Sequence, residues 1–290
     1  MIFVCVLCVA DDCPRVFWLV FGTPELSDIK KSIDDDAIPY SLFEGFQFDE
    51  RAMNKALRTT IRISSDIWHR RCGQKLLLPS SALRIADHHL HASAMLAFEN
   101  DSDWFCVSQA VKCFPVDMLH KKSVDEAHSS LFVTKVGTSS IHLGNSVMLQ
   151  DETLATTQRV FCRVSTSASA SAAFTAQERN KFLEFHHTAD MLPQLERFEA
   201  KLPDSKNSIL SVKVGPQHIN FANHVDHAFL AETAHHALHL MNKGSENLVI
   251  NYFGQPFLGD NLQCFAQDDK VYITRTDDDT GESTLIVVAK

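Results

Sequence analysis

The strongest constraint on the fold is an order of elements that occurs twice along the chain: one strand, one helix, then several strands. In the first half, residues 59–65 alternate as a strand does, and a helix follows Pro79 and Ser80. In the second half, residues 209–214 form the strand and residues 225–241 the helix. Two similar units therefore follow one another, and the sequence predicts an α+β protein.

The apolar positions support this order in both units. In both predicted helices the apolar residues are three or four positions apart, which is the spacing of one buried face. In the first helix these residues are Leu83, Ala86, Leu90, Ala94 and Ala97, and in the second they are Leu230, Ala234, Ala237, Leu238 and Met241. Alternation predicts strands after each helix, with one face formed by Ile141, Leu143, Val147 and Leu149, and another by Val160, Cys162 and Val164. Further strands are expected at 248–253, 261–266, 271–276 and 284–289, the last two joined by a hairpin at Asp279-Thr280-Gly281.

The remaining segments suggest domain boundaries. A charged, helix-favouring stretch at 177–200 is closed by Pro203, so we expect a connecting helix and linker there. The predicted organisation is an N-terminal leader or extension at 1–45, a first unit at 46–175, the connection at 176–208 and a second unit at 209–290.

The apolar start and the cysteines bear on the compartment. The run at residues 2–10 is compatible with a short signal-peptide core, although no positive region precedes it, and equally with an N-terminal strand. The eight cysteines are spread through a long chain with 45% apolar residues, which favours free thiols in a reducing compartment such as the cytoplasm or an organelle. The localisation stays open.

Charge and hydropathy exclude two kinds of partner. The 27 Lys and Arg residues face 36 Asp and Glu residues, giving a net charge of −9, and no basic run could neutralise phosphates. Nucleic acid is therefore not expected. No apolar stretch reaches the roughly 20 residues that a membrane-spanning helix needs.

Several short motifs, in the right order, resemble those of one family. The segment Asn220-Phe221-Ala222-Asn223-His224-Val225-Asp226-His227, with Tyr252 and Gly259-Asp260 downstream, is similar to the signature around the central helix of hotdog-fold thioesterases that act on acyl-CoA or acyl-carrier protein. Val136-Gly137-Thr138-Ser139-Ser140 resembles a strand of the same family in the first unit. The resemblance covers roughly residues 55–290 and implies a double hotdog, with two helices each wrapped by antiparallel sheet.

The resemblance also implies a function and its requirements. It implies hydrolysis of an acyl thioester to a free acid and a thiol, without a cofactor, and further pairing into a homo-oligomer through the hotdog sheets. The family's carboxylate position, four residues before the motif His, holds Asn220 here, whereas Asp66 occupies the corresponding position of the first unit, with Arg70 in place of the His. We therefore expect one composite site, with Asp66 from one unit and His224 or His227 from the other.

The candidate site residues each have a structural alternative. Asp66 follows a strand, where an Asp often bonds local backbone, and Asp226 stands where a helix cap is expected. The two histidines are as compatible with structural hydrogen bonding as with catalysis. The catalytic candidates are Asp66, His224, Asp226 and His227, and the substrate-binding candidates are Asn220, Val225, Ser139 and Ser140.

Three other hypotheses use the same sequence. His235 and His239 lie one turn apart near Glu232, and His88, His89 and His91 cluster on the first helix, but these residues fall on the predicted polar sides, so a solvated face is favoured and no metal is expected. His69-Arg70-Arg71-Cys72-Gly73 before Leu78-Pro79 resembles the motif of double-hotdog dehydratases that act on 3-hydroxyacyl thioesters, with Asp226 as the partner of that His. A double hotdog that binds an acyl group without turnover is the third.

Overall fold

The computed structural model describes residues 2–7, 15–20, 57–62, 68–71, 74–92, 102–115, 126–165, 170–188, 191–204, 207–219, 225–243, 246–277 and 280–290. The chain divides into two compact units, Met1–Glu44 and Gly45–Lys290. In the smaller unit, β1 (Ile2–Leu7) pairs antiparallel with β2 (Arg15–Val20). The apolar start is thus a strand in this structure.

The larger unit contains the repeated order of elements, and its first half runs from β3 to β10. The elements of this half are β3 (Leu57–Arg62), β4 (Trp68–Arg71), β5 (Gln74–Leu77), α2 (Pro79–Ala92), β6 (Ser102–Cys113), β7 (Glu126–Val136), β8 (Ser140–Leu149), β9 (Glu152–Ser165) and β10 (Ala170–Ser171). The connection contains α3 (Ala176–Leu183). The second half contains β11 (Ser208–Lys213), the 3-10 turn η3 (Pro216–His218), α4 (His227–Leu240), β12 (Asn247–Tyr252), β13 (Asn261–Gln267), β14 (Lys270–Thr276) and β15 (Ser283–Ala289).

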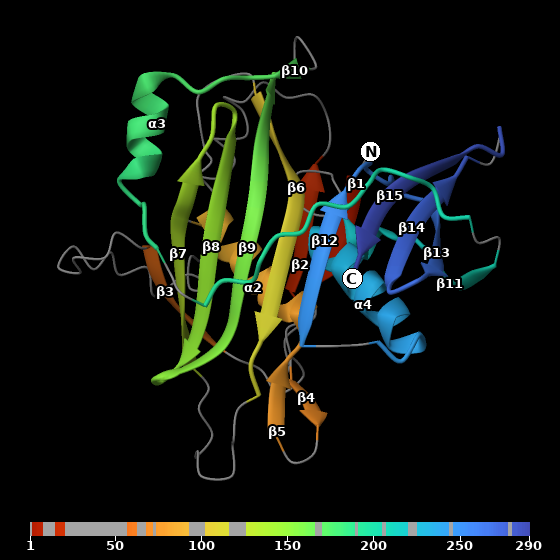
Figure 1. Ribbon diagram of the computed structural model, residues 1–290, viewed down its shortest axis with the longest axis horizontal. Coiled ribbons are helices and arrows are strands. Elements are labelled where there is room, and N and C mark those ends of the chain that lie inside the picture. Colours follow the sequence, from red (N-terminus) through yellow and green to blue (C-terminus); the bar gives the residue numbers. More distant parts are fainter. Residues whose placement is uncertain are drawn as a thin grey trace. The chain divides into compact units, whose positions relative to one another are not determined.

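Most strands of the larger unit form one sheet with internal symmetry (Figure 1), and β4 and β5 form a separate two-stranded sheet. The order of the large sheet is β11-β13-β14-β15-β12-β6-β9-β8-β7-β3, with β10 added beside β9 and the described pairings antiparallel. Counted from its outer edge, the first half has the order β3-β7-β8-β9-β6 and the second half the order β11-β13-β14-β15-β12. In both halves the strand of this sheet that precedes the helix is at the edge, and the strand that follows the helix is at the junction. The halves meet where β12 pairs with β6, from Asn247 opposite Lys112 to Asn251 opposite Ser108. The chain is an α+β protein with a double hotdog fold, as the sequence predicts.

The helices α2 and α4 lie on the same face of the sheet and contact each other (Figure 1). Leu83, Ala86 and Leu90 of α2 are buried, as their spacing predicts, whereas positions 94 and 97 lie outside the described residues. In α4 the predicted residues from Leu230 to Leu238 are buried and Met241 is half-buried just after the helix. None of the helices in the described part of the chain is long and apolar enough to cross a membrane.

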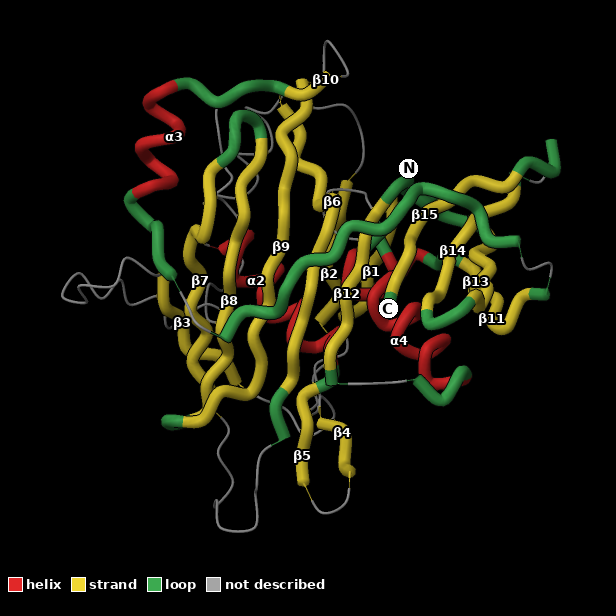
Figure 2. The backbone as a smooth tube through the Cα atoms, viewed as in Figure 1, coloured by secondary structure: helices red, strands yellow, loops and turns green. Residues whose placement is uncertain are grey.

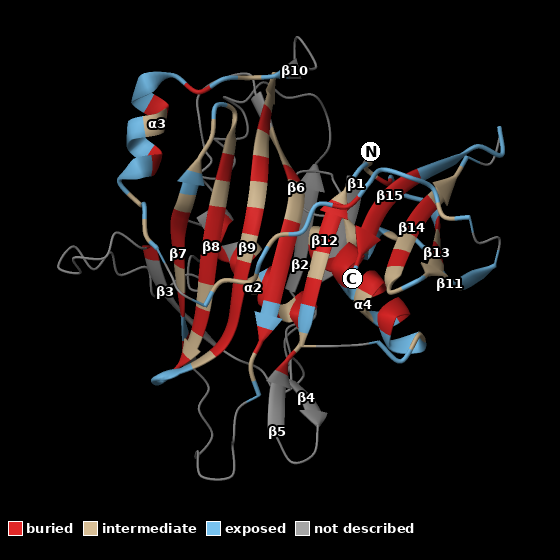
Figure 3. Ribbon diagram, in the orientation of Figure 1, coloured by how far each residue is buried: buried red, intermediate tan, exposed pale blue. Residues whose placement is uncertain are grey.

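The predicted strands are confirmed among the described residues, whereas positions 63–65 and position 279 of the predicted hairpin lie outside them. The face of β9 that points to the helices is unexpected. Ile141, Leu143, Val147 and Leu149 are fully buried along β8. On β9, however, Val160, Cys162 and Val164 share the half-buried outer face, and the buried residues are Arg159, Phe161 and Arg163 (Figure 3). Polar side chains of β9 therefore face the helices.

The connection between the halves is mostly extended, so the helix predicted over 177–200 is wrong beyond its first two turns. The helix α3 ends at Leu183, and residues 191–204 run as an extended strap across the sheet (Figure 2). Phe198 of this strap is buried against Leu285 and Val288, on the sheet face away from the helices. Its backbone N–H donates to Asn251 Oδ1 at 3.2 Å. Tertiary packing overrides the local helix preference here.

Candidate functional site

The site begins at the N-terminus of α4, where Asp226 is the cap. Its Oδ1 accepts from the backbone N–H of Ala228 at 2.8 Å, which satisfies one free donor of the first turn. The backbone N–H of Asp226 donates to the His218 carbonyl at 2.8 Å, and the His218 ring stacks on Phe229 with centroids 3.7 Å apart. Asp226 therefore caps α4, which is the structural role considered for it, and its own N–H is hydrogen-bonded to the His218 carbonyl.

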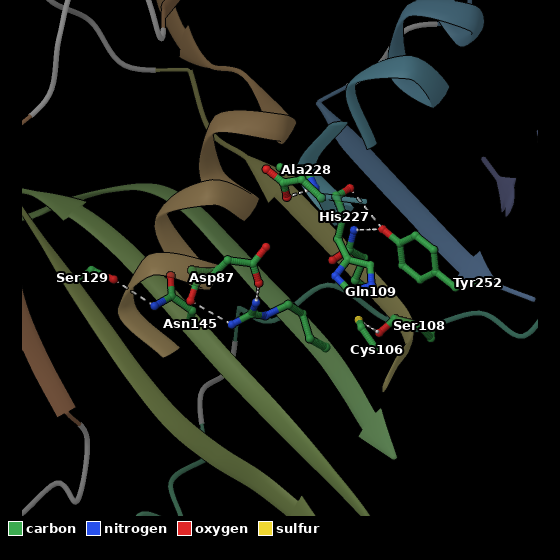
Figure 4. A network of polar contacts seen from close by, with 12 residues as sticks. Asp87, Cys106, Ser108, Gln109, Ser129, Asn145, His227, Ala228 and Tyr252 are labelled. Atoms are coloured by element: carbon green, nitrogen blue, oxygen red, sulfur yellow. Dashed lines mark hydrogen bonds and ion pairs between the residues drawn. The ribbon is translucent and has the colours of Figure 1, made fainter. Parts of the chain in front are cut away.

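The first residue of α4 is held from the junction between the two halves (Figure 4). The Tyr252 hydroxyl donates to the His227 carbonyl at 3.4 Å, and the two rings meet edge to face at 4.9 Å. Gln109, on the neighbouring strand β6, donates from Nε2 to the same hydroxyl. A first-half side chain thus holds Tyr252, and through it the start of the second-half helix.

An ion pair continues the polar contacts towards α2. Arg159 of β9 pairs with Asp87 of α2, and its second amino group donates to the Ala86 carbonyl at 3.0 Å. The Arg159 side chain is 1% exposed and that of Asp87 is 17% exposed. Gln109 and Arg159 stand directly opposite each other in the β6–β9 pairing. The pair is buried and partly desolvated, so breaking it leaves an uncompensated charge.

A third group lies further along the same sheet face. His89 Nδ1 is 2.9 Å from Ser129 Oγ, and Asn145 Nδ2 donates to that hydroxyl oxygen at 2.9 Å (Figure 4). All three residues are buried. The prediction that the histidines of the first helix lie on its polar side is therefore wrong for His89, which is three residues after buried Ala86 and shares its face.

Burial sets the protonation of these groups. Burial raises the pKa of the Tyr252 hydroxyl well above its usual range, so the phenol stays neutral and can donate. Burial raises the pKa of the Cys106 thiol to about 12, which excludes a thiolate nucleophile there. Burial, assisted by the Arg159 charge, lowers the pKa of His89 to about 4, so its imidazole is neutral near pH 7.

The structure brings together only part of the predicted site. Val225 is buried beside Asp226 and His227 at the start of α4, whereas positions 66, 220 and 224 lie outside the described residues. Ser139 lies in the turn between β7 and β8, and Ser140 opens β8. Because β8 is three strands from β12, these serines are about 14 Å along the sheet from Tyr252. They do not meet the α4 N-terminus.

The histidines that suggested a metal lie elsewhere. The rings of His235 and His239 meet edge to face at 4.5 Å, and Glu232 makes an exposed 3.5 Å ion pair with Arg84. Within the described ranges, no group of three or more His, Cys, Asp or Glu residues is placed to hold a metal ion.

A groove of about 390 Å³ lies between the strap and strands β6 and β12, lined in part by Val249, Met191 and Pro193.

Sequence reasoning missed the residues that form the centre of this site. Gln109 meets Tyr252 across 143 positions, and Arg159 meets the first helix across 72, so no local pattern links them. One signal was present. In a strand, every second side chain lies on the same face, so Arg159 shares a face with Ala155 and Phe161. Assigning that face of β9 to the core, instead of the face with Val160, would have predicted that Arg159 is buried.

The fold can be compared with solved structures. An acyl-ACP thioesterase from Bacteroides thetaiotaomicron superimposes with a TM-score of 0.58 at 11% identity, covering 81% of this chain and 96% of that one. A 12:0-ACP thioesterase from Umbellularia californica gives a TM-score of 0.61 at 9% identity, over 82% and 96% of the two chains. At these identities the similarity establishes the fold, and the predicted resemblance to hotdog thioesterases is confirmed at that level.

Two comparisons at the level of the amino-acid sequence found no match. No protein-family model matches the chain. No curated protein matches it either.

Proposed function

We propose that this protein hydrolyses an acyl thioester carried by CoA or acyl-carrier protein. The observation that carries the proposal is that the chain reproduces the fold of two acyl-ACP thioesterases over 96% of their length, with both hotdog halves present. At the junction of these halves, buried polar contacts hold the first turn of α4. Thioester hydrolysis needs a base or nucleophile, an orienting group and donors for the carbonyl oxygen.

The proposed roles follow the sequence motif and the α4 start. Asp66 is the base or nucleophile, and His224 and His227 orient the water or stabilise charge. The backbone N–H groups of Val225 and His227, at the beginning of α4, receive the carbonyl oxygen as it becomes negative, because a helix N-terminus favours an anion. The N–H of Asp226 is excluded from this role by its bond to the His218 carbonyl.

The fixed start of α4 supports these roles. His227 contributes its backbone carbonyl to Tyr252, so replacing its side chain spares that hydrogen bond. His227→Gln is therefore expected to lower turnover without releasing the helix. Asp226 is the cap, and its substitution would change helix stability as well as activity.

The experiment is release of free thiol from short, medium, long and aromatic acyl-CoAs and from acyl-carrier-protein thioesters. The wild type is expected to release thiol, and Asp66→Asn to lose at least about a hundredfold in kcat, as removal of a general base does. Asp204→Asn, an exposed carboxylate on the strap, is the matched control and should retain activity. A protein-only blank corrects for the eight cysteines.

Two outcomes would contradict the proposal. Folded wild-type protein that releases no thiol from any substrate would remove hydrolysis from the account. Activity retained by Asp66→Asn would show that the carboxylate of the composite site is elsewhere.

A further inference from the structure

The two layers between helix and sheet differ in polarity. In the second half, the sheet face under α4 is apolar, formed by Leu248, Ile250, Leu262, Cys264, Val271, Ile273 and Val287. In the first half, the corresponding face carries buried polar residues on four neighbouring strands, namely Gln109, Ser129, Asn145, Thr157 and Arg159. Buried polar atoms are costly unless they are hydrogen-bonded.

Three of these side chains have an atom whose hydrogen-bonding capacity is unused. Asn145 Oδ1, Thr157 Oγ1 and Arg159 Nε are buried without a hydrogen-bond partner among the residues that the structure describes. Asn145 and Thr157 stand directly opposite each other in the β8–β9 pairing, and Arg159 is two residues from Thr157 on the same face. Leaving a buried polar group unpaired is costly, so three neighbouring ones indicate a polar group that is bound there.

The chemistry of the three atoms defines that group. Arg159 Nε–H only donates, Asn145 Oδ1 only accepts, and the Thr157 hydroxyl does both. The Arg159 charge is compensated by Asp87, so the site does not call for an anion. A hydroxyl fits, because it accepts from Arg159 and donates to Asn145. A keto oxygen leaves the Asn145 oxygen unpaired, and a methylene leaves all three atoms unpaired.

The position of the site relative to α4 tells where such a hydroxyl would sit on a substrate. Thr157 is on β9, and only β6, with Gln109, separates this strand from β12. Thr157 lies opposite Val111 of β6, and Val111 lies opposite Leu248 of β12, so Tyr252 is four residues further along β12. Two strand spacings across the sheet and four residues along the strand together give about 16 Å, which an extended chain spans with roughly thirteen carbon atoms.

We propose that Asn145, Thr157 and Arg159 bind the hydroxyl of a hydroxyacyl thioester, at a carbon remote from the thioester group. This inference rests on the proposed function and specifies its substrate class. The acyl chain runs under α2 in the first half, while the thioester lies at the α4 N-terminus. Substrates with a hydroxyl far along the chain are then preferred over the unsubstituted chain of equal length.

The test compares hexadecanoyl-CoA with hexadecanoyl-CoAs that carry one hydroxyl at successive carbons. Wild-type kcat/KM is expected to be roughly tenfold or more higher for the hydroxylated substrate that fits, because the unsubstituted chain leaves buried polar groups unpaired. Thr157→Val, nearly the same shape without the hydroxyl, should remove most of that preference, and Thr157→Ser should keep it. Thr274→Val is the matched control, since Thr274 of β14 also has a buried, unpartnered hydroxyl among the described residues.

Two results would overturn the inference: equal wild-type kcat/KM for hydroxylated and plain chains, or a Thr157→Val variant that lowers kcat/KM equally for both. A buried water would then be the partner of the three atoms. If no thioester is hydrolysed, the proposed function fails, and thermal shifts with hydroxyhexadecanoic and hexadecanoic acids still test the site. The inference then requires a larger shift with the hydroxy acid, reduced in Thr157→Val, and equal shifts overturn it.

Discussion

The neutral, buried imidazole of His89 makes a quantitative prediction about stability and pH. Burial, with a smaller contribution from the Arg159 charge, lowers the pKa of His89 from 6.5 to about 4 in the folded protein. Between these values the unfolded chain binds a proton that the folded protein does not, so stability rises with pH. The contribution is fully present above about pH 6.5 and is lost as the pH falls towards about 4.

The magnitude follows from the size of the shift. Each unit of pKa difference corresponds to about 1.4 kcal/mol, so His89 alone should lower the free energy of unfolding by about 3 kcal/mol between roughly pH 7 and pH 4. His89 is 2% exposed, so solvent screens this effect little. The contact with Ser129 Oγ, 2.9 Å from Nδ1, fixes the ring in this environment.

The assay is urea unfolding across that pH range for the wild type, His89→Asn and His236→Asn. Asn places an amide near the position of Nδ1 without a titrating group, so His89→Asn should lose about 3 kcal/mol less than the wild type on acidification. His236 is exposed on α4, and its variant should follow the wild type. If His89→Asn shows the same pH dependence as the wild type, His89 is not held neutral by burial and the reasoning is refuted.

Three further substitutions test the packing. Asp87→Leu leaves the Arg159 guanidinium buried and unpaired and should lower the free energy of unfolding by about 3–5 kcal/mol. Adding Arg159→Met should recover most of this loss, and a double variant no more stable than Asp87→Leu would contradict this. Phe198→Ala should cost about 3 kcal/mol in urea unfolding because the strap loses its buried ring, and an unchanged midpoint would deny the strap that role. Gly144→Ala should lower the Tm, because its Cβ would stand 2.4 Å from the Phe132 ring; an unchanged Tm would mean that the ring moves without cost.

Local patterns in the sequence were sufficient for much of the fold. The alternation of Ile141 to Leu149 and the helical spacing around Leu230 reflect residues whose environment depends mainly on their own element. The repeated order of elements predicted two similar units, and the resemblance of their motifs to hotdog thioesterases implied the double hotdog. The connection was not predictable in this way, because Phe198 is held extended by the outer face of a sheet formed from residues far away in sequence.

The site was less accessible to such reasoning. Asp226 and Val225 were found through a motif next to a helix start, and the cap confirms the structural part of that interpretation. Gln109 and Arg159 act through partners that only strand order brings near. The apolar residues of β9, such as Val160, indicated the wrong face because β9 places Arg159 and Arg163 on its buried face.

The proposal of thioester hydrolysis is tested most directly by following the water. Acyl-CoA and acyl-carrier-protein substrates would be incubated with the protein in water enriched in the heavy oxygen isotope, and the released acid analysed by mass spectrometry. Hydrolysis predicts one heavy oxygen in the carboxylate of the product acid, in the presence of wild-type protein and not of Asp66→Asn. Folded protein that yields no labelled acid from any of these thioesters would contradict the account.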